Sequence, residues 1–135
     1  MSSINKAIVS WFRADADLAA VAGPFNGVIP PTGVTYPYCV FHDRGGRVML
    51  FFDGSLIKPK RFTFEIFSPD EAAAAAYQQA LHERFHRAAI PMTGSIFLAC
   101  VREDDMILPA AVTRGGDTKY VYKAVTLFRI QAEET

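Results

Sequence analysis

Hydrophobic residues recur with helical spacing at the start of the chain. Within residues 3–22, apolar side chains stand three, four or seven positions apart, which places them on one stripe of a helix. The stripe consists of Ile4, Ala7, Ile8, Trp11, Phe12, Leu18 and Val21. Ser2 or Ser3 can cap the start, and a glycine and a proline directly follow the stripe and can end the helix. The pattern predicts an amphipathic helix over residues 3–22.

The middle of the chain combines an alternating strand with a second helix. Within residues 56–67, apolar positions alternate with polar ones, which predicts a strand with one buried and one solvated face. The apolar positions are Phe62, Phe64 and Ile66, and the polar ones are Arg61, Thr63 and Glu65. A Ser-Pro-Asp-Glu sequence follows, with Ser68 as the expected N-cap and Glu71 completing a capping box. We expect this helix to run to about Ala88.

The remaining segments complete a mixed helix and strand order. Residues 23–37 hold four prolines and three glycines and are expected to form a loop. Strands are expected at residues 38–43, 95–103 and 119–131, with a long loop over residues 104–117. The predicted fold class is α+β, a two-layer sandwich in which an antiparallel sheet of about four strands carries two helices on one face. Residues 1–135 are expected to form a single domain.

The last predicted strand carries side chains that suit neither a buried nor a fully solvated sheet face. Lys123 and Arg129 alternate in phase with Val121, Val125 and Leu127. One face of the sheet is therefore expected to be only half solvated. Such a face indicates a contact between copies of the chain.

Composition excludes several classes of protein. Fourteen Lys and Arg balance fourteen Asp and Glu, so the net charge is zero, which argues against a dedicated nucleic-acid binder. The apolar runs are too short to span a membrane, and the N-terminus lacks the apolar block of a signal peptide. Cys39 and Cys100 lie in apolar runs and are interpreted as core residues, which favours a reducing compartment.

One string matches a catalytic motif. His82, Glu83 and His86 form H-E-x-x-H, in which two histidines one helical turn apart bind zinc and the glutamate acts as general base. The helical phase, however, places both histidines towards the solvent side of their helix. No third ligand continues the motif, and only His42, Glu103 or Asp104 could be recruited. A solvated helix face is the preferred interpretation, so no catalytic, cofactor or metal residue is assigned.

Two other groups of residues are candidate contact sites. Met49, Leu50, Phe51 and Phe52 form an uninterrupted apolar run, which is either an ordinary buried strand or a loop tip that packs on a second subunit or another partner. Arg44, Arg47, Arg114 and Lys119 lie in two locally basic regions. A single copy of such a basic rim would attract a polyanion only weakly, but several copies arranged around the polyanion would act together.

Taken together, the order and spacing of these segments resemble the tail-completion, or tail-terminator, proteins of long-tailed bacteriophages and prophages. The resemblance covers roughly residues 4–130. It rests on the opening helix, on the Pro-rich loop that enters the strand Tyr-Pro-Tyr-Cys-Val-Phe (36–41), and on the aromatic strand Arg-Phe-Thr-Phe-Glu-Ile-Phe (61–67) with the helix directly after it. The closing strand over residues 120–130 completes the pattern.

The resemblance implies a structural, non-enzymatic role in the virion with no cofactor. Members of the family form a ring, typically a hexamer, at the head-proximal end of the tail tube. The ring stops polymerisation of the tube protein and joins the tail to the head connector, while DNA passes through the lumen without sequence-specific binding. The implied location is the virion tail, with the host cytoplasm as the place of assembly. Two alternatives stay open: a small zinc-dependent hydrolase that uses the HERFH helix, and an α+β binding module with another partner.

Overall fold

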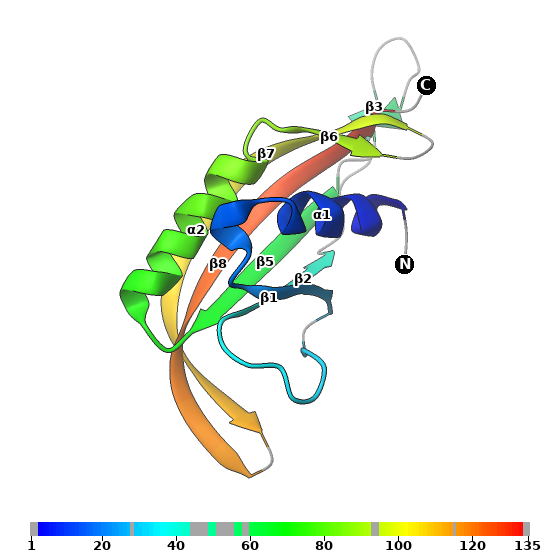
Figure 1. The fold of residues 1–135 in the computed structure, drawn as a ribbon. Helices are drawn as coiled ribbons and strands as arrows, with labels where there is room; N and C mark the ends of the chain where they lie inside the picture. Colours follow the sequence, from blue (N-terminus) through cyan, green and yellow to red (C-terminus); the bar gives the residue numbers. More distant parts are fainter. Residues whose placement is uncertain are drawn as a thin grey trace.

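The computed structural model describes residues 3–27, 29–43, 49–50, 56–57, 60–92, 95–114 and 116–133 (Figure 1). Within these ranges only the backbone is described for residues 3, 49–50, 56–57, 60, 92, 95–99, 114 and 131–133. The helices are α1 (Ser3–Arg13), the short 3-10 helix η1 (Ala16–Leu18) and α2 (Glu71–Phe85). The strands are β1 (Ala22–Asn26), β2 (Tyr38–Asp43), β3 (Met49–Leu50), β4 (Leu56–Ile57), β5 (Lys60–Ser68), β6 (Ala89–Met92), β7 (Ser95–Arg114) and β8 (Asp117–Glu133).

The main sheet has six strands in the order β1-β2-β5-β8-β7-β6, and β3 pairs with β4 in a separate two-stranded sheet. The expected α+β class is confirmed. The sheet is larger than the expected four strands, and it is mixed because β1 runs parallel to β2 whereas the other neighbours are antiparallel. Among the strands that the structure describes, β1 and β6 each pair with one neighbour only, and each contains a proline, which sheets tolerate at such edges.

Strand β1 replaces the first part of the loop expected over residues 23–37. Gly23 adopts a φ of +101°, and a Cβ at this position would lie 2.6 Å from the carbonyl oxygen of Cys39. Only glycine therefore allows the backbone to approach β2 this closely. The approach is what turns a Gly-Pro segment into an edge strand instead of a loop.

Both helices differ from their expected limits. Helix α1 ends at Arg13 instead of continuing to residue 22, because Asp15 accepts a hydrogen bond from the backbone N–H of Asp17 and starts the separate helix η1. Helix α2 is capped by Asp70, which accepts from the N–H of Ala72 at 3.2 Å, and not by Ser68. Ser68 is instead the last residue of β5, and its Oγ accepts from the N–H of Asp70.

The main core lies between the sheet and both helices, which cover the same face (Figure 1). Phe64 of β5 stands at its centre, with ring centroids 5.6 Å from Phe41, 5.3 Å from Phe85 and 5.5 Å from Phe128. These four rings come from β2, β5, β8 and α2. The alternation in residues 61–67 thus points the expected side chains into the core.

The two helices are also joined directly. The indole Nε1 of Trp11 donates to the carbonyl oxygen of Arg84 at 2.8 Å, and the Nε of Arg84 donates to the carbonyl oxygen of Trp11 at 2.9 Å. The guanidinium carbon of Arg84 lies 3.7 Å from the centroid of the Trp11 ring. This reciprocal contact fixes α1 against the C-terminal half of α2.

The largest difference from the sequence prediction is strand β7. The loop expected over residues 104–117 is a continuous strand from Ser95 to Arg114 that forms a long hairpin with β8. Pro109 is compatible with this strand because β6 pairs only with residues up to Ala99, so residue 109 has a strand neighbour on one side only within the described chain. A register shift between Arg102 and Asp104 marks a β-bulge in the same strand.

The end of this hairpin projects beyond the rest of the sheet. Strand β5 pairs with β8 only as far as Ser68 opposite Tyr122, whereas β7 and β8 continue to pair up to Arg114 opposite Asp117. Residues 110–114 and 117–121 are therefore a two-stranded ribbon, here called the arm, which extends away from the helices (Figure 1). None of the helices in the described part of the chain has the length and apolar character needed to cross a bilayer.

Candidate interaction surface

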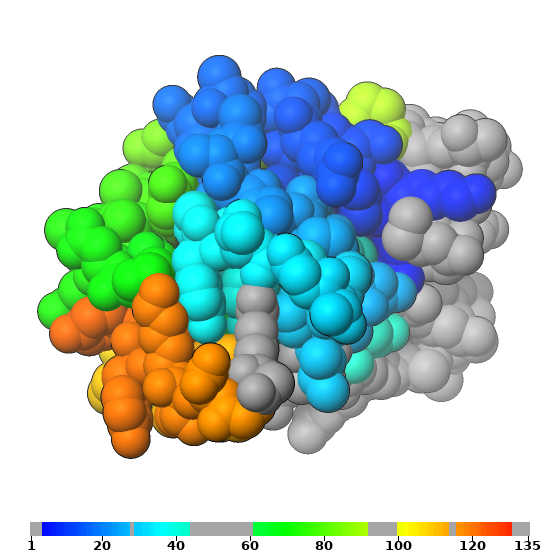
Figure 2. Space-filling model, turned by 60° about the horizontal axis from the view of Figure 1, so that its bottom comes forward, coloured from blue at the N-terminus to red at the C-terminus, as the bar shows by residue number. Residues whose placement is uncertain are grey.

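A groove lies at the base of the arm, on the face of the sheet that the helices leave uncovered. Its volume is about 630 Å³. One wall is the segment Ile29–Gly33, the other is Ala110–Thr113 of the arm, and the floor consists of sheet residues. Figure 2 shows the loop that contains this segment, in cyan, beside the arm, in orange.

Aromatic packing builds the floor of the groove. Tyr38 of β2 stacks on Phe67 of β5 with ring centroids 4.8 Å apart, and Tyr36 lies 5.4 Å from Tyr38. Tyr38 and Phe67 belong to a second buried cluster with Val40 and Val121, separate from the core under the helices. The loop that follows β1 is thus held against the sheet by the contact of its Tyr36 with Tyr38 of β2.

A pair of opposite charges also lies in the floor. The carboxylate of Glu65 is 3.9 Å from the Nζ of Lys123, and the two side chains are 15% and 28% exposed. This distance is within the range of an ion pair but too long for a hydrogen bond. The groove therefore combines apolar walls with a carboxylate that has spare capacity to accept hydrogen bonds.

The opposite face of the arm exposes a large aromatic residue. The side chain of Tyr120 is 80% exposed, whereas that of its neighbour Val121 is 2% exposed. Successive residues of a strand point to opposite faces, so Val121 packs under the groove while Tyr120 points away from it. Ile29, on the rim of the groove, is also highly exposed, and Met106 and Leu108 of β7 are partly exposed.

The expected half-solvated face is found on β7 and β8. Met106 lies opposite Val125, and Leu108 lies opposite Lys123, so apolar and charged groups alternate across the two strands. Towards the arm, the same alternation of apolar positions along β7 continues from Met106 and Leu108 to Ala110 and Val112. This period-two pattern is the signal in the sequence that indicates a strand, whereas the proline within it is typical of the loop that was expected.

The apolar run Met49–Phe52 is described only in part. The backbones of Met49 and Leu50 form β3, paired with Ile57 and Leu56 of β4, and their side chains lie outside the description. Phe51 and Phe52 also lie outside the described residues. The interpretation of this run as a subunit contact stays a prediction.

Of the four residues of the basic rim, only Lys119 has a side chain that the structure describes. Arg44 and Arg47 lie outside the described residues, and Arg114 is described as the last residue of β7 by its backbone alone. The ammonium group of Lys119, near the tip of the arm, lies 5.1 Å from the centroid of the Tyr36 ring. Lys119 therefore helps hold the arm against the loop, and a joint action of the four cations stays a prediction.

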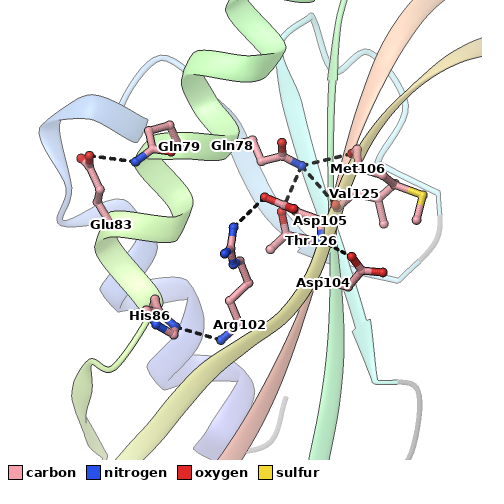
Figure 3. A network of polar contacts seen from close by, with 10 residues as sticks. All are labelled: Gln78, Gln79, Glu83, His86, Arg102, Asp104, Asp105, Met106, Val125 and Thr126. Atoms are coloured by element: carbon pink, nitrogen blue, oxygen red, sulfur yellow. Dashed lines mark hydrogen bonds and ion pairs between the residues drawn. The ribbon is translucent and has the colours of Figure 1, made fainter.

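The HERFH string lies on α2 and the turn after it, and its two histidines are half-buried. As the helical phase predicted, they lie outside the buried side of the helix, which consists of Ala74, Ala80, Leu81 and Phe85. Their rings stack with centroids 4.8 Å apart. The Nδ1 of His86 accepts a hydrogen bond from the N–H of Arg102 at 3.1 Å, so this nitrogen connects α2 to β7 (Figure 3). Burial, followed by the charges of His82, Arg87 and Arg102, lowers the pKa of His86 below its usual range.

Two of the three potential third metal ligands form hydrogen bonds elsewhere, and the third, His42, lies in a different strand. Glu103 accepts a hydrogen bond from the Nε of Arg61, Asp104 accepts one from the N–H of Asp105, and His42 lies in β2 opposite Thr63. Within the described ranges, no three His, Cys, Asp or Glu side chains come together as a metal site.

A second polar contact anchors α2 to the long hairpin. The amide nitrogen of Gln78 lies within 3.1 Å of the carbonyl oxygens of Met106 and Val125, and 3.4 Å from the Oγ1 of Thr126 (Figure 3). Its neighbour Gln79 points away from the sheet and donates to Glu83. Gln78 therefore joins the helix to the two strands that continue into the arm.

Comparison with known proteins yields similarity of fold. No protein family and no curated protein matches the sequence. Among solved structures, a chain from the virion of a native gene transfer agent particle is 14% identical, with a TM-score of 0.61 over 94% of this chain and 93% of that chain. A second solved chain is 15% identical, with a TM-score of 0.51 over 96% of this chain and 91% of that chain.

Proposed function

We propose that this chain is a structural virion protein that caps the head-proximal end of a phage-type tail tube. In this role it stops polymerisation of the tube protein and joins the finished tail to the head connector. The observation that carries the proposal is the likeness of the whole fold to a chain of a gene transfer agent virion, which covers 94% of this chain. The order of helices and strands that resembles tail-terminator proteins supports the same role.

The proposed working form is a ring of identical copies, with six as the expected number. A ring has head-to-tail contacts, so each copy needs two different surfaces that fit one another. The described part of this chain has two different surfaces available for such contacts, the exposed Tyr120 and the groove. A net charge of zero suits a lumen through which DNA must pass without being retained.

Loss of the gene tests the proposed role in the particle that carries it. We expect tails that grow past their normal length and heads without tails, both visible by electron microscopy. A plasmid copy of the wild-type gene should restore tails of uniform length joined to heads. Normal tails on particles that lack the protein would refute the proposal.

A second experiment uses purified components. We expect the protein, added to polymerising tail-tube protein, to bind the tube ends and reduce the mean tube length in a concentration-dependent way. Metal analysis of the same sample tests the alternative of a zinc-dependent hydrolase, which requires bound zinc in a fixed ratio to the chain. Tubes of unchanged length, together with bound zinc, would favour the hydrolase instead.

A further inference from the structure

The arm is exposed towards its tip. Residues 117–120 of β8 are all exposed, and Tyr120 is exposed to 80%. A two-stranded ribbon without a third strand is marginally stable in water. Tyrosine is also among the residue types that contribute most to protein interfaces. The arm therefore has the properties of a segment that packs against another molecule.

The free edge of β7 is poorly suited to bind that molecule by strand pairing. Pro109 has no N–H to donate. Directly beyond the residues that pair with β6, the carbonyl oxygen of Cys100 accepts a hydrogen bond from the N–H of Arg87. Arg102 and Asp105 form an ion pair of 2.8 Å within the same stretch. Charges and proline at an edge disfavour the addition of a further strand, so side-chain contacts on the arm are the better candidate.

The chemistry of the groove fits a phenol ring. Pro30, Pro31 and Phe67 supply apolar surface for the ring. Glu65 offers a carboxylate that is only 15% exposed and whose contact within the described chain, Lys123, is 3.9 Å away. A hydroxyl group that donates to this carboxylate would form the charge-assisted hydrogen bond that the groove lacks.

We propose that the arm of one copy binds the groove of a second copy, with Tyr120 as the side chain that enters it. Tyr120 makes no hydrogen bond or ring contact in the described part of the chain. It points away from its own groove, because it lies on the opposite face of β8 from Val121. A second copy can meet both requirements at once: its groove receives the ring, and its Glu65 accepts from the hydroxyl.

This contact generates head-to-tail assembly. The groove and Tyr120 lie on opposite faces of one ribbon, so each copy that receives an arm also presents one. Such a heterologous contact closes into a ring when the rotation from one copy to the next is a whole fraction of 360°. The inference rests on the proposed ring and deepens it by naming the surface through which neighbouring copies bind.

Site-specific cross-linking tests the contact. Thr118 is exposed and lies on the same face of β8 as Tyr120, and Ile29 is 83% exposed on the groove rim. We mix a Thr118→Cys variant with a mass-tagged Ile29→Cys variant and add a short bismaleimide. The two natural cysteines are buried and should not compete. We expect a mixed dimer that forms about tenfold faster than with a Gln79→Cys and Ile29→Cys control pair, a ratio equivalent to about 1.4 kcal/mol.

A third substitution distinguishes the two partners of the contact. Tyr120→Ala in the copy that carries Thr118→Cys should reduce the cross-linking rate to that of the control pair. The same change in the copy that carries Ile29→Cys should leave the rate unchanged, because that copy contributes only its groove. Tyr120→Phe in the arm copy should give an intermediate rate, since it keeps the ring and loses the hydroxyl group.

The outcomes separate this contact from the proposed function. The arm-and-groove contact would be overturned if the cross-linking rate equalled that of the control pair. It would also be overturned if Tyr120→Ala lowered the rate equally in either copy. If the protein nevertheless shortens tail tubes, the capping role stands with a different subunit interface. If the cross-link forms as expected while tube length is unchanged, the contact stands and the capping role fails.

Discussion

His86 illustrates how one side chain couples a helix to a strand. Its Nδ1 accepts from the N–H of Arg102, and protonation of that nitrogen would remove the acceptor. The pKa of His86 is lowered in the folded chain, so at mildly acidic pH the unfolded chain binds more protons at this position. Neutral His86 therefore makes its full contribution to the stability of the fold above about pH 6.5, the pKa of a histidine in the unfolded chain. This contribution is lost as the pH falls below that value.

We predict that the melting temperature of the wild type falls between about pH 7.5 and pH 5, and that His86→Asn makes this decline shallower. Asparagine keeps an oxygen acceptor but does not titrate. Thermal unfolding across the pH range measures the effect, with Gln79→Ala as a control on the exposed side of the helix. An unchanged pH slope in His86→Asn would rule out this histidine as the cause.

The two cysteines should be chemically inert in the folded protein. Both are buried, and burial raises the pKa of Cys100 to about 12. Burial, together with the negative charge of Glu65, raises the pKa of Cys39 as well. Because the thiolate is the reactive form, we expect no labelling by a thiol reagent at about pH 8 and labelling of both residues in denaturant. Rapid labelling of the native protein would contradict this burial.

At the scale of elements, Gln78 fixes α2 to the hairpin that carries the arm. Gln78→Glu would replace an amide donor by a carboxylate that faces the carbonyl oxygens of Met106 and Val125. We expect a loss of about 1 kcal/mol in the free energy of unfolding, the low end of the range for a polar group without its partner, because Gln78 is only partly buried. The control Gln79→Glu should change it by about 0.5 kcal/mol or less, because Gln79 is exposed. Equal effects of both changes would refute a special role for Gln78.

The hairpin itself shows where a local pattern misleads. Pro109 and the polar residues before it are typical of a loop, yet the structure places them in β7, opposite a partner strand on one side. Edge position makes proline acceptable, and edge position is a property of the assembled sheet. The groove and the exposed Tyr120 follow from this hairpin, so neither could be predicted from the local pattern.

At the scale of the whole molecule, stability and assembly should depend on different residues. Phe64 contacts three aromatic rings at the centre of the core, whereas Tyr120 lies on the exposed arm. We predict that Phe64→Ala lowers the free energy of unfolding by about 3–5 kcal/mol, and that Tyr120→Ala changes it by less than about 0.5 kcal/mol. Denaturant titration of both variants measures the difference. A large loss of stability in Tyr120→Ala would mean that its effect on cross-linking is indirect.

The sequence by itself determined the α+β class, where each of the two helices begins to within a few residues, and which side chains of β5 enter the core. Period-two and period-3.6 patterns report directly which side chains must leave water, as at Phe62, Phe64 and Ile66. Tertiary structure alone decided which segments become edge strands, where the arm leaves the sheet, and how Glu65 meets the loop after β1 across the groove. These features depend on pairing between residues far apart in the chain, and such pairing leaves no local period from which it could be predicted.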